Sequence, residues 1–169
     1  RVMLPVRKCI RFSPWLRSKA VGMVDLFFKL NADKFPVKQF NAIHVRMGDY
    51  KWRWEGSSDY QRAKTIVTKV MGEGLDPKIP LYLASDEPNS AMFNELKRKF
   101  SVLTMRDLPR NLIESYMKLF PEGRIRGDML GVLDQLICAQ AKVFIPTKWS
   151  TFSENIDFIN TFYDEFGIP

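Results

Sequence analysis

The fold is decided by the stretch Phe40–Arg46, FNAIHVR, a short β-prone run that ends in polar residues. A proline-containing loop precedes it and Gly48 follows it, so the run has the length and the boundaries of a buried strand. Side chains alternate along a strand, which places His44 and Arg46 on one side and Val45 on the other. We therefore expect two polar groups to converge at the carboxyl end of this strand.

Apolar runs and helical patterns alternate along the rest of the chain. Three further runs have the composition of strands: residues 80–85, 100–105 and 142–145. The predicted helices cover residues 14–31, 58–71, 88–99, 112–119, 128–141 and 151–166. Ser13 with Pro14 marks the start of the first helix, and possible capping boxes at Ser58–Gln61 and Thr151–Glu154 mark two others. This alternation predicts a parallel sheet covered on both faces, a Rossmann-like α/β layer sandwich that binds ligands at the carboxyl ends of its strands.

The chain length of 169 residues fits one domain. A unit of this size buries roughly 70% of the surface that its unfolded chain exposes, so it needs neither disulfides nor a structural metal. The sequence contains no run of about 18 apolar residues, the length that spans a bilayer. We therefore expect a single Rossmann-like domain over residues 1–169 and no membrane span.

The net charge of +7, from 26 Lys and Arg against 19 Asp and Glu, favours an anionic partner such as a phosphate, a nucleic acid, a membrane surface or an acidic protein. The basic residues are interleaved with acids, as in Glu95–Lys99, which argues against a nucleic-acid-binding arm. Trp52 and Trp54 could stack on a base or a sugar, or could equally cover a hydrophobic rim. A basic polyanion-binding protein is therefore one alternative.

Residue types and spacings exclude several kinds of catalytic site. The single histidine excludes a His-rich zinc site, and Cys138, within an apolar stretch, is expected to be a buried and inert thiol. The absence of a Walker loop and of GxGxxG argues against kinases, ATPases and NAD enzymes. Asp86 and Glu87 follow the second predicted strand, but adjacent side chains point apart and do not form the carboxylate pair of a glycosidase.

Candidate binding residues gather at the carboxyl edge of the predicted sheet. Arg46 carries a planar, five-donor guanidinium suited to phosphate, and Gly48 allows the backbone to approach a ligand closely. Arg46 could instead pair with Asp49, with His44 satisfied beside it, and the spacing leaves both interpretations open. Asp86 ends the second strand and is expected to face the same crevice.

Two further candidates belong to the C-terminal third of the chain. Ser150 and Thr151 precede the last predicted helix, where free N–H groups and the helix dipole favour an anion, although N-capping alone would also explain them. Asp134 lies among apolar residues and requires a partner. It could accept from the two donor nitrogens of a guanine edge, or it could cap or pair with a basic neighbour.

These motifs together resemble the GDP-fucose protein O-fucosyltransferase family, in particular the type that modifies thrombospondin repeats. Three segments carry the resemblance: His44-x-Arg46, Tyr82–Glu87, and Leu133–Ala141 continuing through Phe144–Ile145 to Ser150–Ser153. The first is similar to the family's HxR motif, the second to its second strand, and the last to its donor-binding signature in order and spacing. Together they cover most of the chain, from about residue 15 to residue 156.

The resemblance implies two facing Rossmann-like domains of the GT-B type, of which this chain corresponds to the C-terminal, donor-binding one. The family's N-terminal acceptor domain lies outside these 169 residues. The implied reaction is an inverting transfer of fucose from GDP-fucose to a Ser or Thr hydroxyl of a folded protein domain, with no metal or other cofactor and no nucleic-acid partner. The implied compartment is the lumen of the endoplasmic reticulum or Golgi.

By position, the resemblance assigns Arg46 to the β-phosphate of GDP, as the catalytic residue that stabilises charge on the leaving group. His44 would line the same pocket, and Asp134 would recognise the guanine edge. Hydroxyl and backbone donors to the diphosphate would come from Ser150, Thr151 and Phe152. The alternatives to a transferase are a non-catalytic GDP-sugar or glycan-binding module and the polyanion-binding protein, which would show weak base preference and a steep salt dependence.

Overall fold

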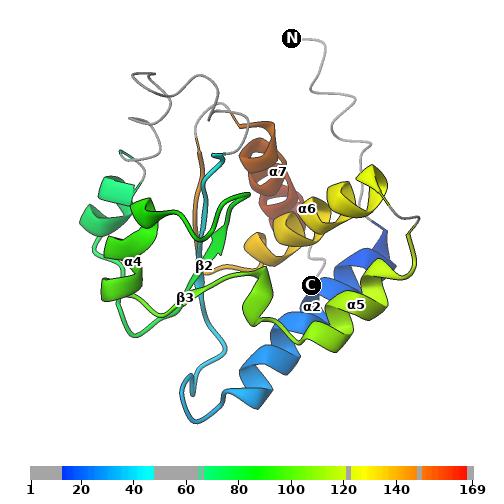
Figure 1. The fold of residues 1–169 in the computed structure, drawn as a ribbon, viewed down its shortest axis with the longest axis horizontal. Helices are drawn as coiled ribbons and strands as arrows, with labels where there is room; N and C mark the ends of the chain where they lie inside the picture. The colour runs from blue at the N-terminus through cyan, green and yellow to red at the C-terminus, as the bar shows by residue number, and fades with distance from the viewer. Residues whose placement is uncertain (1–12, 48–64, 66, 121–122, 148–149, 167–169) are drawn as a thin grey trace.

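In the part of the chain that the structure describes, four strands form one parallel sheet with helices on both faces (Figure 1). The computed structural model describes residues 13–47, 65, 67–120, 123–147 and 150–166. The strands are β1 (Asn41–His44), β2 (Leu81–Ala84), β3 (Val102–Leu103) and β4 (Val143–Ile145), in the spatial order β3-β2-β1-β4. The helices are α2 (Pro14–Leu30), α4 (Asn94–Lys99), α5 (Arg110–Met117), α6 (Arg124–Cys138) and α7 (Thr151–Phe166), with 3-10 turns η2 (Ala91–Phe93) and η3 (Met105–Asp107).

The central position of β1 explains its composition. It pairs with β2 from Asn41 opposite Leu81 to His44 opposite Ala84, and with β4 on its other side. Every residue of β1 and β2 is buried. A strand covered on both faces has no solvent side, so apolar residues fill the middle of β1 and all of β2 without alternation, while Asn41 and His44 at the two ends of β1 are buried polar residues. The predicted α/β fold with a parallel sheet is confirmed.

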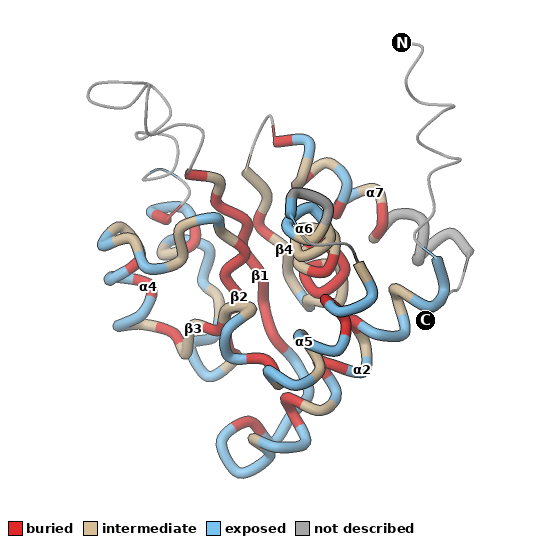
Figure 2. The backbone as a smooth tube through the Cα atoms, turned by 45° about the vertical axis from the view of Figure 1, so that its right-hand side comes forward, coloured by how far each residue is buried: buried red, intermediate tan, exposed pale blue. Residues whose placement is uncertain are grey.

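The side chains of the sheet contribute alternately to two hydrophobic cores. Ala42 and Tyr82 belong to the core that also contains residues of α2, α6 and α7. Ile43 and Leu83 belong to the other core, with residues of α4. Figure 2 shows the buried strands in the middle, with α4 to one side and α6 and α7 to the other. Because side chains two residues apart share a face, His44 lies on the side of α6 and α7.

The helix predicted over residues 88–99 and the strand predicted over residues 100–105 are both shorter in the structure. Ser90 caps the turn η2, so that the α-helix begins only after this turn. A capping box between Thr104 and Asp107 ends β3 and starts η3. In both places a local side-chain hydrogen bond to the backbone sets the boundary, which the hydrophobic pattern does not reveal.

The helix predicted over residues 128–141 begins earlier and ends earlier, as α6. Gly123 precedes it with a φ of 96°, a left-handed conformation that glycine adopts without strain, and the helix starts directly after this residue. Residues 65 and 67–72 are helical, within the helix predicted over residues 58–71. The capping box predicted at Ser58–Gln61 lies outside the described residues.

The packing of α6 on the sheet can be tested at Leu133, which is fully buried in the core beside Tyr82. We expect Leu133→Ala to lower the free energy of unfolding by roughly 2–5 kcal/mol, because it removes buried methyl groups and leaves a cavity. Urea denaturation followed by circular dichroism measures this change. Leu119→Ala is the control, because Leu119 is 58% exposed and its truncation should cost less than about 1 kcal/mol. Equal losses in the two variants would contradict the packing described.

Candidate functional site

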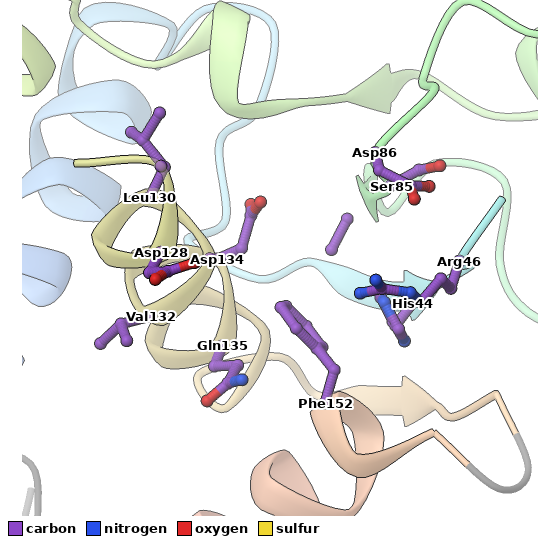
Figure 3. A pocket seen from close by; sticks show the side chains of 13 residues that line it. His44, Arg46, Ser85, Asp86, Asp128, Leu130, Val132, Asp134, Gln135 and Phe152 are labelled. Carbon is purple, nitrogen blue, oxygen red and sulfur yellow. The ribbon is translucent and has the colours of Figure 1, made fainter. Parts of the chain in front are cut away.

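The carboxyl ends of β1 and β2 open into a pocket of about 510 Å³ (Figure 3). Its walls come from the segments that follow the two strands, from α6 and from the first turn of α7. The polar and aromatic lining residues are His44, Arg46, Ser85, Asp86, Asp128, Asp134, Gln135 and Phe152. This pocket therefore lies at the sheet edge where parallel α/β proteins bind their ligands.

His44 is buried and is held from two directions. Its Nδ1 lies 2.9 Å from Ser153 Oγ, and its ring stacks on Phe152 with 4.1 Å between the ring centroids and 17° between the planes. Ser153 Oγ also accepts the N–H of Thr147 at 3.0 Å, and the Thr147 hydroxyl donates to the carbonyl of His44. These interactions join the ends of β1 and β4 to the first turn of α7.

His44 is uncharged at neutral pH, whereas Arg46 is a cation. Burial, with the nearby Arg46 charge as the second cause, lowers the pKa of His44 from 6.5 to about 3. A guanidinium stays protonated in proteins. Figure 3 shows the two side chains beside each other at the end of β1. This wall of the pocket therefore offers one positive charge and, next to it, a neutral imidazole whose Nδ1 already bonds to Ser153.

Asp86 connects the ends of β1 and β2. Its Oδ1 accepts the backbone N–H of Met47 at 2.7 Å, which fixes the backbone directly after Arg46. The side chain is exposed and lines the pocket, as predicted for a residue at the end of the second strand. Four residues singled out from the sequence lie outside the described part of the chain: Gly48, Asp49, Trp52 and Trp54.

Asp134 projects from α6 on the wall opposite Arg46, and its carboxylate extends toward the strands (Figure 3). Its Oδ1 accepts a hydrogen bond from the hydroxyl of Tyr82 at 2.5 Å. Burial raises the pKa of Asp134 from 3.8 to about 7, and the bond from Tyr82 opposes this rise. The carboxyl thus has the partner that its apolar surroundings require, but this partner is a tyrosine from β2 and not a basic neighbour.

The three residues predicted at the start of the last helix have different surroundings. Ser150 is buried, and its carbonyl accepts the N–H of Glu154 at 2.9 Å. Thr151 is exposed as the first residue of α7, and Phe152 is the member of this trio that lines the pocket. The predicted capping box with Thr151 as its cap is wrong, because Thr151 is already the first residue of α7 and the N–H of Glu154 bonds to the carbonyl of Ser150.

The sequence reasoning missed Tyr82 and Gln135 as functional residues. A tyrosine within an otherwise aliphatic buried strand is itself a signal, because its hydroxyl needs a partner. Gln135 is 8% exposed and lines the pocket beside Asp134. Its Oε1 is buried and has no hydrogen-bond partner among the described residues, so a ligand N–H would satisfy it. Cys138 is buried with a free thiol, as predicted.

The described residues contain neither a helix suited to span a membrane nor a cluster of side chains suited to hold a metal ion. None of their helices combines the length and the apolar composition needed to cross a membrane. They also contain no group of three or more His, Cys, Asp or Glu side chains arranged to hold a metal ion.

The fold and the pocket define a parallel α/β protein in which a cation, a neutral histidine and a buried carboxyl surround one cavity at the carboxyl edge of the sheet. A comparison with family models finds a match between residues 3–160 and the GDP-fucose protein O-fucosyltransferase model. The chain therefore belongs to the GDP-fucose protein O-fucosyltransferase family, which confirms the family indicated by its motifs. No match was found among curated proteins.

The buried carboxyl makes a pH-dependent contribution to stability. The pKa of Asp134 is about 7 in the folded state and about 4 in an unfolded chain, so the folded state binds a proton more tightly. Stability from this group is therefore lost as the pH rises from about 4 to about 7. We expect Asp134→Asn to raise the free energy of unfolding more at pH 8 than at pH 5, because the amide oxygen can still accept from Tyr82 and carries no charge.

Urea denaturation of the variant and the wild type at both pH values measures this difference. His44 has the opposite dependence, since its lowered pKa makes stability fall as the pH falls below 6.5. His44 is present in both proteins, so its contribution cancels when the two are compared at one pH. A gain that is no larger at pH 8 than at pH 5 would show that Asp134 is not buried as described.

Proposed function

We propose that this chain is the donor-binding domain of a GT-B-type protein O-fucosyltransferase, which binds GDP-fucose for inverting transfer to a Ser or Thr hydroxyl of a folded protein domain. The observation that carries the proposal is the placement of Arg46 and the half-buried Asp134 in one pocket. A guanidinium suits a diphosphate, and a carboxylate accepts the paired N–H groups of guanine. The pocket volume of about 510 Å³ also falls within the range of small-molecule sites.

Asp134 and its neighbour Gln135 form the base-recognising side of the proposed site. An ionised carboxylate is acceptor-only, so it matches the adjacent N1–H and N2–H donors of guanine and not the acceptor-bearing edges of adenine or uracil. The Oε1 of Gln135, which has no hydrogen-bond partner within the described part of the chain, offers a further acceptor on the same helix. His44 and Phe152, stacked on one another, supply a flat wall between the base side and the phosphate side of the pocket.

Arg46 is the catalytic residue of the proposed reaction. When the bond between fucose C1 and the β-phosphate oxygen breaks, its electron pair leaves with GDP, and the guanidinium stabilises the negative charge that develops there. Ser150 and Thr151, at the N-terminus of α7, add hydroxyl and N–H donors toward the diphosphate in this proposal. Asp86 fixes the backbone after Arg46, and Gly48 and Asp49, which follow in the sequence, are further candidate pocket residues of this proposal.

The acceptor hydroxyl attacks C1 from the face opposite to the leaving phosphate, which inverts the anomeric configuration. Its proton passes to a base that the family resemblance assigns to the acceptor-binding domain. We further propose that the enzyme acts in the lumen of the endoplasmic reticulum or Golgi.

Loss of one charge-stabilising donor in the transition state of the transfer costs roughly 3 kcal/mol, so we expect Arg46→Ala to abolish detectable transfer in the complete enzyme.

Donor recognition is tested by calorimetric titration of the chain with GDP, GMP, ADP and UDP at two salt concentrations. We expect selective binding of GDP, and a loss of roughly 10- to 100-fold in affinity for Arg46→Ala, because a hydrogen-bonded charge pair is removed. Asp134→Ala should remove the preference for guanine. Arg110→Ala is the matched control: Arg110 pairs with Glu114 on the exposed side of α5, so its variant should bind GDP as the wild type does.

The same experiment separates the alternatives. Binding of all four nucleotides with little base preference and a steep salt dependence would favour the polyanion-binding protein. Selective GDP binding without transfer, when the chain is joined to an acceptor-binding half of the family, would favour a non-catalytic GDP-sugar-binding module. Equal binding by Arg46→Ala and Arg110→Ala would contradict the placement of the diphosphate.

A further inference from the structure

Tyr82 occupies a position in the sheet that fixes its hydroxyl. It lies in β2, paired with Ala42 of β1 on one side and with Leu103 of β3 on the other. The side chain is 2% exposed, and its ring packs edge-on against Phe40 with 6.3 Å between centroids. A residue with strands on both sides and a ring neighbour has almost no freedom, so the hydroxyl has one position relative to the pocket.

The hydroxyl of Tyr82 is directed at the group that the proposed function uses for base recognition. It donates to Asp134 Oδ1 across the gap between β2 and α6. A carboxylate oxygen carries two lone pairs, so Oδ1 retains one for a ligand N–H while Oδ2 remains for a second. Burial and the Asp134 charge both raise the pKa of Tyr82 well above 10, so Tyr82 keeps its proton and is always the donor in this pair.

The other ionisable groups around Asp134 do not replace this hydrogen bond. Cys138 on the same helix is a buried, uncharged thiol, because burial raises its pKa well above 9. Asp107, of η3, acts on Tyr82 as a negative charge and so gives Asp134 no positive partner. On the pocket side lie the neutral imidazole, the Arg46 cation at the phosphate side, and two further carboxyls, Asp86 and Asp128.

We propose that Tyr82 is a positioning residue for nucleobase specificity, whose hydroxyl orients the Asp134 carboxylate and favours the ionised form that accepts the paired N–H donors of a guanine-type base. The proposal rests on the proposed function and deepens it. Geometry supports it through the fixed hydrogen bond that Tyr82 makes from β2 to Asp134 on α6. The direction of the pKa effect agrees, because this bond is the influence that opposes the rise in the pKa of Asp134.

Tyr82→Phe removes the hydroxyl and keeps the ring. We expect its affinity for GDP at pH 7 to fall by about tenfold, the effect of one hydrogen bond to a charged group, and to recover toward the wild-type value as the pH is raised to 9. Calorimetry with GDP between pH 6 and pH 9 measures both effects. Carbon-13 NMR of the Asp134 carboxyl in the ligand-free protein should show a titration midpoint about one pH unit higher in the variant.

Tyr116→Phe is the matched control. Tyr116 is also a buried tyrosine that bonds to α6, through the carbonyl of Met129 at 3.3 Å, and it does not line the pocket. Its variant should lose stability as Tyr82→Phe does, but should keep the wild-type pH dependence of GDP binding and the wild-type carboxyl titration. A purely structural role of Tyr82 would make the two variants alike in these two measurements, and that result would overturn the proposal.

The two measurements distinguish failure of this inference from failure of the proposed function. If the wild type binds no GDP at any pH, the proposed function is wrong, and with it the role of Tyr82 in base recognition. If the wild type binds GDP but the carboxyl midpoint is the same in Tyr82→Phe, the proposed function stands and the inference about Tyr82 is wrong.

Discussion

The hydrogen bond between His44 and Ser153 is the interaction on which the site depends. His44 ends the central strand, and its imidazole is buried in a place where a polar ring without a partner would be destabilising. Ser153 supplies that partner from the first turn of α7 and also accepts the N–H of Thr147 after β4. One hydroxyl therefore aligns two strand ends with a helix start. The position of Arg46, two residues beyond His44, follows from that alignment.

The pocket brings together two groups whose charged forms burial disfavours. The pKa of His44 is lowered and that of Asp134 is raised, in each case mainly by desolvation. Because His44 is neutral at neutral pH, the positive charge on this wall of the pocket comes from Arg46. For Asp134, desolvation means that the pKa of the carboxyl is about 7, so a ligand with paired N–H donors would favour its ionised form. Desolvation of these two groups lowers the stability of the fold, a cost that functional sites commonly carry.

The elements of the fold were predicted correctly where the residue composition of a segment and its burial in the folded protein favour the same structure. The apolar run around Ile43 is a strand both by composition and by its burial on two faces, and the same is true of Leu81–Ala84. The boundaries were less accurate where a short side chain bonds to the backbone. Ser90 and Thr104 each cap the start of a 3-10 turn, and such a side-chain bond to the backbone competes with the regular element that the hydrophobic pattern predicts. The partner of Asp134 was not predicted for a different reason, because it lies 52 positions away in the chain and is set by tertiary packing.

The sequence by itself determined the class of fold, the family, and the residue types that gather at the carboxyl edge of the sheet. It could do so because hydrophobic periodicity and the order of motifs are properties of neighbouring residues. Only the tertiary structure decided that Tyr82 bonds to Asp134 and that Phe152 stacks on His44. It also decided that the hydroxyl of Ser153, in the first turn of α7, bonds to His44 at the end of β1. These pairings join residues from different elements, and their geometry depends on strand register and on the packing of α6 and α7 against the sheet.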